Sequence, residues 1–264
     1  MPKPPRSRYP ADPHPWREPW EHGVRLDRLS IVVLAQQHNP SILNPDFLTR
    51  NRIADDAWEC VQQICIGGLA RVQYSCGITV VSQPDRIVFE QEFRPARLDE
   101  CVVARMVSRY VRIVPHVVYT AIGTNPFASV QFEDQATAEA FVGDRLLRDA
   151  NARAYGGSVP SAAVTLRWIY EGGLQWQVQL GATPGGGGGP GRLLRAEGNA
   201  HRLGATPGGG GGPEWLLRIE GNAHRDLSDR AHPDRLGAIR RVSGRWETDV
   251  AVFRSLVGTT LMEL

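Results

Sequence analysis

The sequence contains a single lysine, Lys3, against 29 arginines, and no stretch approaches the ~20 apolar residues that cross a bilayer. Its four cysteines (Cys60, Cys65, Cys76 and Cys101) form no CxxC pair and have no histidine at zinc-finger spacing. The first residues lack the apolar segment of a secretory signal. These absences predict a protein of a reducing bacterial cytoplasm, with no membrane span and no structural zinc.

The near absence of lysine has two interpretations. A GC-rich genome accounts for it without any functional demand. Alternatively, the arginines recognise phosphate or carboxylate groups, which a planar guanidinium binds in a bidentate manner. The net charge of only +2 excludes a chain-wide field that would draw the protein onto nucleic acid or an anionic membrane.

Familiar catalytic and cofactor motifs are also missing. The glycine runs Gly185–Gly189 and Gly208–Gly212 are not followed by the Lys and Ser or Thr that a phosphate-binding P-loop needs. There is no GxSxG nucleophile motif and no HExxH metal motif. The sequence therefore predicts no cofactor and no metal ion.

The most informative feature present is a tandem duplication. Leu180–Arg202 and Leu203–Arg225 align without gaps as two 23-residue units that differ at only three positions. Where the second copy has Trp215 and Ile219, the first has Arg192 and Ala196. Residues two apart share one face of a strand, so the first copy has lost two large apolar side chains from the face that the second copy retains. We therefore expect the second copy to form a core strand, and the Gly-rich segment 180–213 to hold an insert that is looped out.

Apolar periodicity predicts the secondary structure along the chain. Strands are expected at Leu29–Ala35, Trp58–Ile66, Val72–Val80, Ile87–Phe93, Val117–Ile122, Val164–Tyr170, Leu174–Leu180 and Trp215–Glu220. Helices are expected at Val102–Val114, with Asp99 as the N-cap, and over 134–148, 234–242 and 246–262. The segment Gly123–Pro126 is expected to end its strand in a turn.

Strands linked by hairpins predict an α+β fold with a mainly antiparallel sheet. Two hairpin-then-helix halves are expected, with the helices packed on one face of the sheet. Residues 24–264 are predicted to form a single domain.

Residues 1–23 are rich in Pro, Arg and Trp without periodicity and are predicted to be a disordered arm. Its aromatic residues Tyr9, Trp16 and Trp20 are candidate contacts for a partner or for the protein's own surface, although a flexible tail is the simpler interpretation.

Two histidines and an asparagine are weak candidates for catalysis. His38 follows the first predicted strand, and Asn222 and His224 follow the second-copy strand. If those strands were neighbours, the three side chains would meet at one sheet edge, with a carboxylate from Asp55, Asp56 or Glu59 completing an acid–base or metal site. Structural histidines are the simpler alternative.

Basic residues concentrate near the C-terminal end, where Arg240, Arg241 and Arg245 form a local excess that could contact phosphates. A solvated helix face is the alternative, because no helix-turn-helix or aromatic RNA-binding pattern accompanies them.

The leading functional hypothesis is a non-enzymatic interaction or accessory subunit with a protein partner or in a homo-oligomer. A small-molecule-binding domain or hydrolase using the His/Asn site, and an Arg-mediated nucleic-acid binder, are the alternatives.

Overall fold

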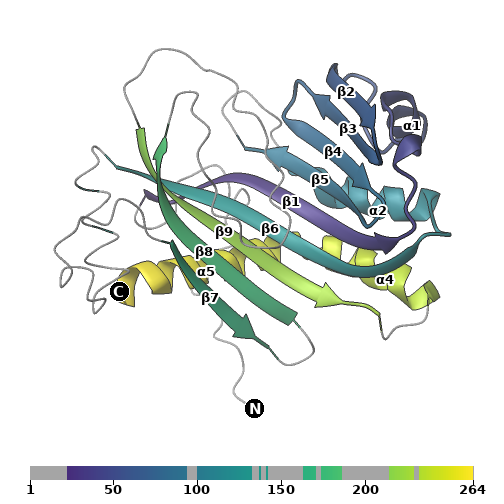
Figure 1. Ribbon diagram of the computed structural model, residues 1–264. Coiled ribbons are helices and arrows are strands. Elements are labelled where there is room, and N and C mark those ends of the chain that lie inside the picture. Colours follow the sequence, from purple (N-terminus) through teal and green to yellow (C-terminus); the bar gives the residue numbers. More distant parts are fainter. Residues whose placement is uncertain are drawn as a thin grey trace.

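The structure is a computed structural model that describes residues 23–93, 100–132, 163–170, 174–185, 214–228 and 232–263, together with Thr137 and Phe141. Its strands are β1 (Arg25–Gln36), β2 (Cys60–Ile66), β3 (Leu69–Tyr74), β4 (Ile78–Gln83), β5 (Arg86–Glu92), β6 (Val118–Phe132), β7 (Ala163–Ile169), β8 (Leu174–Gly185) and β9 (Glu214–Asp226). Its helices are η2 (Pro40–Ile42), α1 (Pro45–Arg50), α2 (Val103–Ile113), α4 (His232–Ser243) and α5 (Trp246–Glu263). The strands form one twisted antiparallel sheet in the order β2-β3-β4-β5-β1-β6-β9-β8-β7 (Figure 1). The predicted sheet-dominated α+β class with mainly antiparallel pairing is confirmed.

The segment predicted as one strand, Val72–Val80, is a hairpin. Strands β3 and β4 are joined through a turn in which Gly77 has a φ of 90°, a conformation that favours glycine. The register pairs Val72 with Val80, so even-numbered residues of both strands lie on the same buried face. One long strand and this hairpin therefore give the same apolar alternation, and the prediction was wrong because periodicity alone does not distinguish them.

Strand β6 continues through the predicted turn Gly123–Pro126. It pairs with β1 on one side and with β9 on the other. Pro126 pairs with Leu29 of β1 and Gly123 pairs with Val32, and this pairing keeps the segment extended. The turn prediction was wrong because pairing of the whole segment with β1, and of Gly123 and Thr124 also with β9, outweighs the local preference of Gly, Asn and Pro for turns.

Helix α2 begins later than predicted. Its N-cap is Val102, which makes no side-chain capping hydrogen bond, so the predicted cap at Asp99 is wrong. The Val102 amide instead donates to Oε1 of Gln91 on β5 at 2.8 Å. A side chain from the sheet thus satisfies one of the amides that the helix start leaves without a partner.

Helices α2 and α5 contact the same face of the sheet. Phe89 packs edge-on against Tyr110 of α2, and Trp176 stacks on Phe253 of α5, with ring centroids 5.5 and 6.1 Å apart. Cross-strand partners share a face, and a chain of partners joins the two contacts: Phe89, Ile31, Thr124, Ala223 and Trp176. Helix α4 packs against α2 and β6, and Figure 1 shows all three helices behind the sheet. We call this side the helix face and the other the polar face.

The second copy of the duplication forms β9, as predicted, and Leu217 and Ile219 are fully buried. The first residues of the first copy extend β8, which pairs with β9 from Leu174 opposite Arg225 to Gly185 opposite Glu214. The rest of the first copy, and with it the predicted looping-out, lies outside the described residues.

Other predictions fall partly outside the described residues. The arm lies there except for Gly23, as do Tyr9, Trp16 and Trp20. Of the helix predicted over 134–148, only Thr137 and Phe141 are described, both helical. The helices predicted over 234–242 and 246–262 are confirmed as α4 and α5. No helix in the described ranges is long and apolar enough to cross a membrane.

Candidate functional site

His38 is a buried member of a polar network on the helix side of the fold. Its Nδ1 lies 2.9 Å from Oγ of Ser82 on β4, and its Nε2 is hydrogen-bonded to the Tyr110 hydroxyl of α2. His38 is 4% exposed, and Ser82 and Tyr110 are fully buried. Burial, and to a lesser extent the charge of His116, lowers the pKa of His38. A serine beside a histidine suggests a nucleophile, but no substrate reaches these closed atoms, and the network ties α2 to the sheet.

The structure does not bring His38 together with Asn222 and His224. Strand β6 lies between β1 and β9, so the neighbouring strands that the hypothesis required are not neighbours. Gly123 is the common partner of His224 and of Val32, six residues before His38. Asn222 and His224 also lie within β9 rather than in a loop after it, because β9 extends to Asp226.

The predicted carboxylates are also distant in the topology from His38. Asp55, Asp56 and Glu59 are exposed and precede β2, which β3, β4 and β5 separate from β1. Asp55 caps its own turn through the amide of Ala57 at 3.0 Å. Within the described ranges, no three His, Cys, Asp or Glu side chains come together as metal ligands.

Asn222 instead belongs to a row of polar residues across the polar face. The register of β6 and β9 places Asn125 opposite Asn222, and their Oδ1 atoms lie 3.7 and 3.6 Å from where a Cβ on Gly123 would stand. Successive cross-strand partners make up this polar row: Gln62, Gln73, Thr79, Glu90, Ser30, Asn125, Asn222, Gln177 and Arg167. Sequence reasoning missed the row because its members are distant along the chain and only the strand order aligns them.

The middle of the polar row is partly buried and holds charge. Arg28 lies over the ring of Phe127, 3.9 Å from its centroid, and its Nε is 3.5 Å from Oε2 of Glu90. Burial raises the pKa of Glu90, and the Arg28 guanidinium opposes that shift. Three buried polar atoms there make no hydrogen bond, namely Arg28 Nε, Arg71 Nε and Asn125 Oδ1.

The three predicted phosphate-binding arginines lie together at the end of α4. Arg240 and Arg241 belong to its last turn, and Arg245 follows in the turn to α5. All three are exposed. The amide of Gly244 donates to the Arg240 carbonyl and that of Arg245 to the Val242 carbonyl, so the turn holds the helix end compact.

Two adjoining hollows open beside these arginines and share Arg241. One has a volume of about 370 Å³ and is lined by Ser108, Gly237, Arg240 and Arg241. The other has about 240 Å³, and its lining comprises Leu174, Arg225, Asp226, Leu227, Ala238, Arg241, Val242 and Arg245. Three guanidinium groups and a single carboxylate therefore meet over an apolar floor in the second hollow, which favours an anionic ligand group.

Arg225 lines this second hollow, and its side chain is held in place by Asp249. It donates two hydrogen bonds to Asp249 of α5, at 3.1 and 2.6 Å. Asp249 is 2% exposed, so the pair joins β9 to α5 as a buried bidentate contact. Arg225 is thus neutralised by Asp249, and Arg241 and Arg245 are the arginines that a ligand in the hollow would meet.

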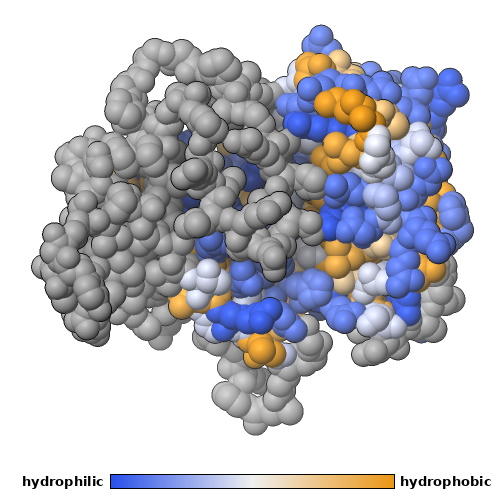
Figure 2. All heavy atoms as spheres, in the orientation of Figure 1, coloured by the Kyte–Doolittle hydropathy of each residue, from blue (hydrophilic) through white to orange (hydrophobic). Residues whose placement is uncertain are grey.

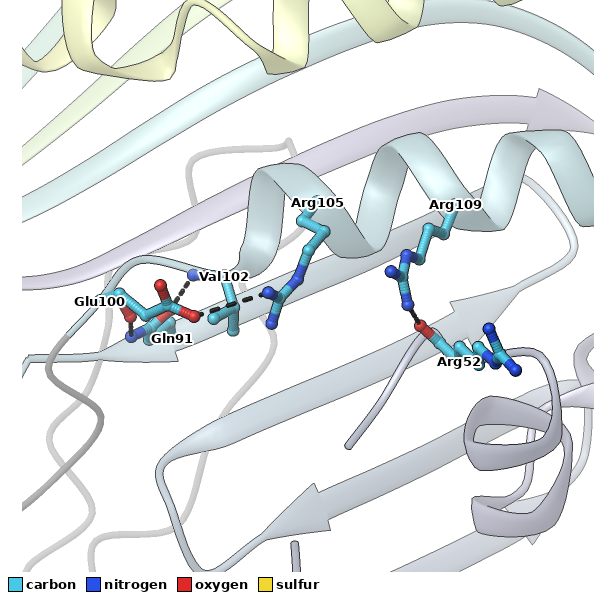
Figure 3. A network of polar contacts seen from close by, with 6 residues as sticks. All are labelled: Arg52, Gln91, Glu100, Val102, Arg105 and Arg109. Carbon is cyan, nitrogen blue, oxygen red and sulfur yellow. Dashed lines mark hydrogen bonds and ion pairs between the residues drawn. The ribbon is translucent and has the colours of Figure 1, made fainter. Parts of the chain in front are cut away.

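Helix α2 packs against α4 and contributes Ser108 to the first hollow. In Figure 3 its Arg105 and Arg109 project toward Glu100 and Arg52. Arg105 forms a 3.6 Å ion pair with Glu100, whereas Arg109 donates to the main-chain carbonyl of Arg52. The two helices together carry six arginines and one acidic residue, Asp234.

No protein-family model matches the chain, and a search of curated proteins finds no significant match. The candidate function therefore depends on the geometry of these residues.

Proposed function

We propose that this chain is a non-enzymatic interaction subunit that binds the phosphate groups of a nucleic acid. The binding surface, which we call the helix layer, consists of α2, α4 and the turn to α5. The carrying observation is that Arg240, Arg241 and Arg245 converge around two adjoining hollows. Guanidinium groups bind phosphates bidentately, and base edges or apolar sugar surface would contact the apolar floor.

The distribution of charge supports this proposal. Helices α2 and α4 carry a formal charge of +5, while the whole chain carries only +2. The rest of the molecule, α5 included, is therefore slightly acidic, and a polyanion approaching from solution is directed toward α2 and α4.

The test is fluorescence anisotropy of labelled single-stranded and duplex oligonucleotides at 50 to 200 mM salt. We expect binding that weakens steeply with salt. The triple variant Arg240→Gln, Arg241→Gln, Arg245→Gln should weaken it for all sequences. It should also reduce the slope of log K against log salt by about one for each arginine that binds a phosphate in the unmodified protein.

A matched variant changes two exposed arginines outside the helix layer, Arg167→Gln and Arg218→Gln. This control should retain the affinity and the slope of the unmodified protein. Absence of binding at 50 mM salt, or equal losses in both variants, would refute the proposal. If the unmodified protein bound an acidic protein partner and the triple variant did not, the arginines would recognise an acidic protein rather than a nucleic acid.

The polar row supports a second candidate, a small-molecule-binding domain or hydrolase centred on Asn222 and His224. It is favoured by the exposed Asn222 and the partly exposed His224, which lie on the same face of β9 and which a bound polar molecule would contact. Nucleotides should then raise the melting temperature, and His224→Ala should abolish that rise. A variant that behaves like the unmodified protein would eliminate this candidate.

Two further proposals concern the role of the N-terminal arm, residues 1–23, and the division of the domain into two halves. Tyr9, Trp16 and Trp20 are proposed to capture a protein partner, and deletion of residues 1–23 should abolish that complex. We also propose that β2–β5 with α2, and β7–β9 with α4 and α5, form two hairpin-then-helix halves of one cytoplasmic domain.

A further inference from the structure

Strand β2 is one edge of the sheet and has exposed residues on both of its faces. Six of its seven residues are exposed, among them Val61 at 54% and Ile66 at 73%. Figure 2 shows hydrophobic surface interrupting the hydrophilic surface where Figure 1 places β2 and β3. An exposed apolar edge strand is a template for pairing with another strand.

The hydrogen bonds to β3 determine which backbone groups of β2 point outward. Gly67 and Gly68, with φ of 56° and 82°, form the two-residue turn that closes the hairpin at Ile66 and Leu69. The closing pair of such a turn exchanges both of its hydrogen bonds, and the bonding residues then alternate along the strand. Ile66, Ile64 and Gln62 therefore bond to β3, and Cys65 and Gln63 direct their N–H and C=O groups outward.

The start of the strand agrees with this assignment. The amide of Ser75 donates to the Glu59 carbonyl at 2.9 Å, and a register shift between Cys60 and Gln62 marks a bulge. Val61 is the extra residue of this bulge and has no partner on β3, so its backbone groups are available together with those of Gln63 and Cys65. Three alternate residues centred on Gln63 thus offer hydrogen bonds to another strand.

Apart from the bulge at its start, strand β2 lacks the features that protect edges. Its sequence contains no charged residue and no proline, whereas natural edge strands commonly carry lysine, proline or an inward charge. The opposite edge strand, β7, carries the exposed Arg167. Because β2 is uncharged, two copies of it meet without like-charge repulsion.

We infer that β2 pairs antiparallel with β2 of a second copy of this chain, around a two-fold axis at Gln63. In this register Val61 is opposite Cys65 of the partner subunit, and Gln63 is opposite Gln63 of the partner subunit. All three outward residues then find outward partners, whereas a shift by one residue would oppose outward residues to residues already bonded to β3. The two sheets become continuous, and the contact is isologous.

The test uses the symmetry of this register. The full chain should show a concentration-dependent monomer–dimer equilibrium in sedimentation velocity. Gln63→Lys and Gln63→Asp each place like charges opposite each other and should raise the dimer dissociation constant about tenfold or more. Because unlike charges would then be opposite, a mixture of the two variants should form a heterodimer at concentrations where each alone is monomeric.

Two outcomes would overturn the inference. One is a full chain that stays monomeric at all accessible concentrations, and the other is a dimer that both Gln63 variants leave unchanged. Gln63 is exposed, so circular dichroism should show that the variants keep the fold. Thr165→Lys on β7 serves as the control, since it places a charge on the other edge and should leave the dimer intact.

Discussion

At the residue scale, Gly221 shows how closely α5 approaches the sheet. A Cβ there would lie 2.7 and 2.8 Å from ring atoms of Phe253 and 3.0 Å from Pro126. Phe253 is fully buried, and Pro126 belongs to the central strand β6, so neither side chain has room to move away. The glycine is therefore required by packing rather than by backbone conformation.

We predict that Gly221→Ala lowers the free energy of unfolding by about 1–3 kcal/mol, the usual cost of forcing one extra carbon into a packed core. Gly198→Ala changes the equivalent residue of the first copy and should leave stability unchanged. Urea denaturation of both variants measures the difference. Equal losses would mean that the two copies share the structural role assigned to the second.

The buried His38 predicts a pH dependence of stability. Its lowered pKa keeps the imidazole neutral in the folded state, whereas the unfolded chain protonates at its ordinary pKa of about 6.5. The unfolded state therefore binds more protons in this range, so the contribution to stability is complete above pH 6.5 and decreases as the pH falls toward the folded pKa. Urea denaturation between pH 8 and 5 should show this loss, and His38→Gln should flatten the curve. Parallel curves would show that another group is responsible.

At the element scale, the β8–β9 hairpin explains how the chain accommodates a duplication. The strands pair from Leu174 opposite Arg225 to Gly185 opposite Glu214, and 28 residues connect them. Removing Leu180–Arg202 leaves Gly209–Pro213, a five-residue connection of ordinary hairpin length, between the restored β8 and β9. The cross-strand register is the same with one copy or with two, so the extra copy does not reverse the chain.

We predict that deletion of Leu180–Arg202 retains the fold, because the second copy restores every deleted residue of β8. Stability should be unchanged or higher by about 1 kcal/mol, since closing a shorter loop costs less chain entropy. Thermal and urea unfolding of the shortened protein provide the measurement. A loss of several kcal/mol would show that the first copy contributes to the core.

A second element-scale prediction compares the two copies directly. Leu217 is fully buried on β9, so Leu217→Ala should lower the free energy of unfolding by about 2–5 kcal/mol. Leu194→Ala changes the equivalent residue of the first copy and should have almost no effect. If Leu194→Ala proved more destabilising than Leu217→Ala in denaturation experiments, the assignment of β9 to the second copy would be wrong.

At the scale of the whole molecule, the two proposed surfaces belong to different parts of the fold. The arginines lie on α2, α4 and the turn to α5, while the proposed dimer contact is the outer edge of β2. We predict that the triple arginine variant remains dimeric in sedimentation velocity and that Gln63→Asp still binds oligonucleotides. Loss of both properties in either variant would show that dimerisation and nucleic-acid binding depend on each other.

Local patterns predicted most strands and helices because they depend on neighbours in sequence. Alternation predicted β7 and β8, and helical spacing predicted α4 and α5. The comparison of Ile219 with Ala196 identified the copy that enters the core, since burial selects for large apolar side chains. The convergence of Arg240, Arg241 and Arg245 was foreseeable for the same reason, as one helix end holds them together.

Tertiary structure alone decided what depends on strand order. It placed β6 between β1 and β9, which separated His38 from His224. It kept Gly123–Pro126 extended by pairing the segment with β1 and its first two residues with β9 as well. It also enclosed His38 between Ser82 and Tyr110 and aligned the polar row from nine strands. Pairing partners are chosen by long-range contacts and their register, which periodicity along the chain does not encode.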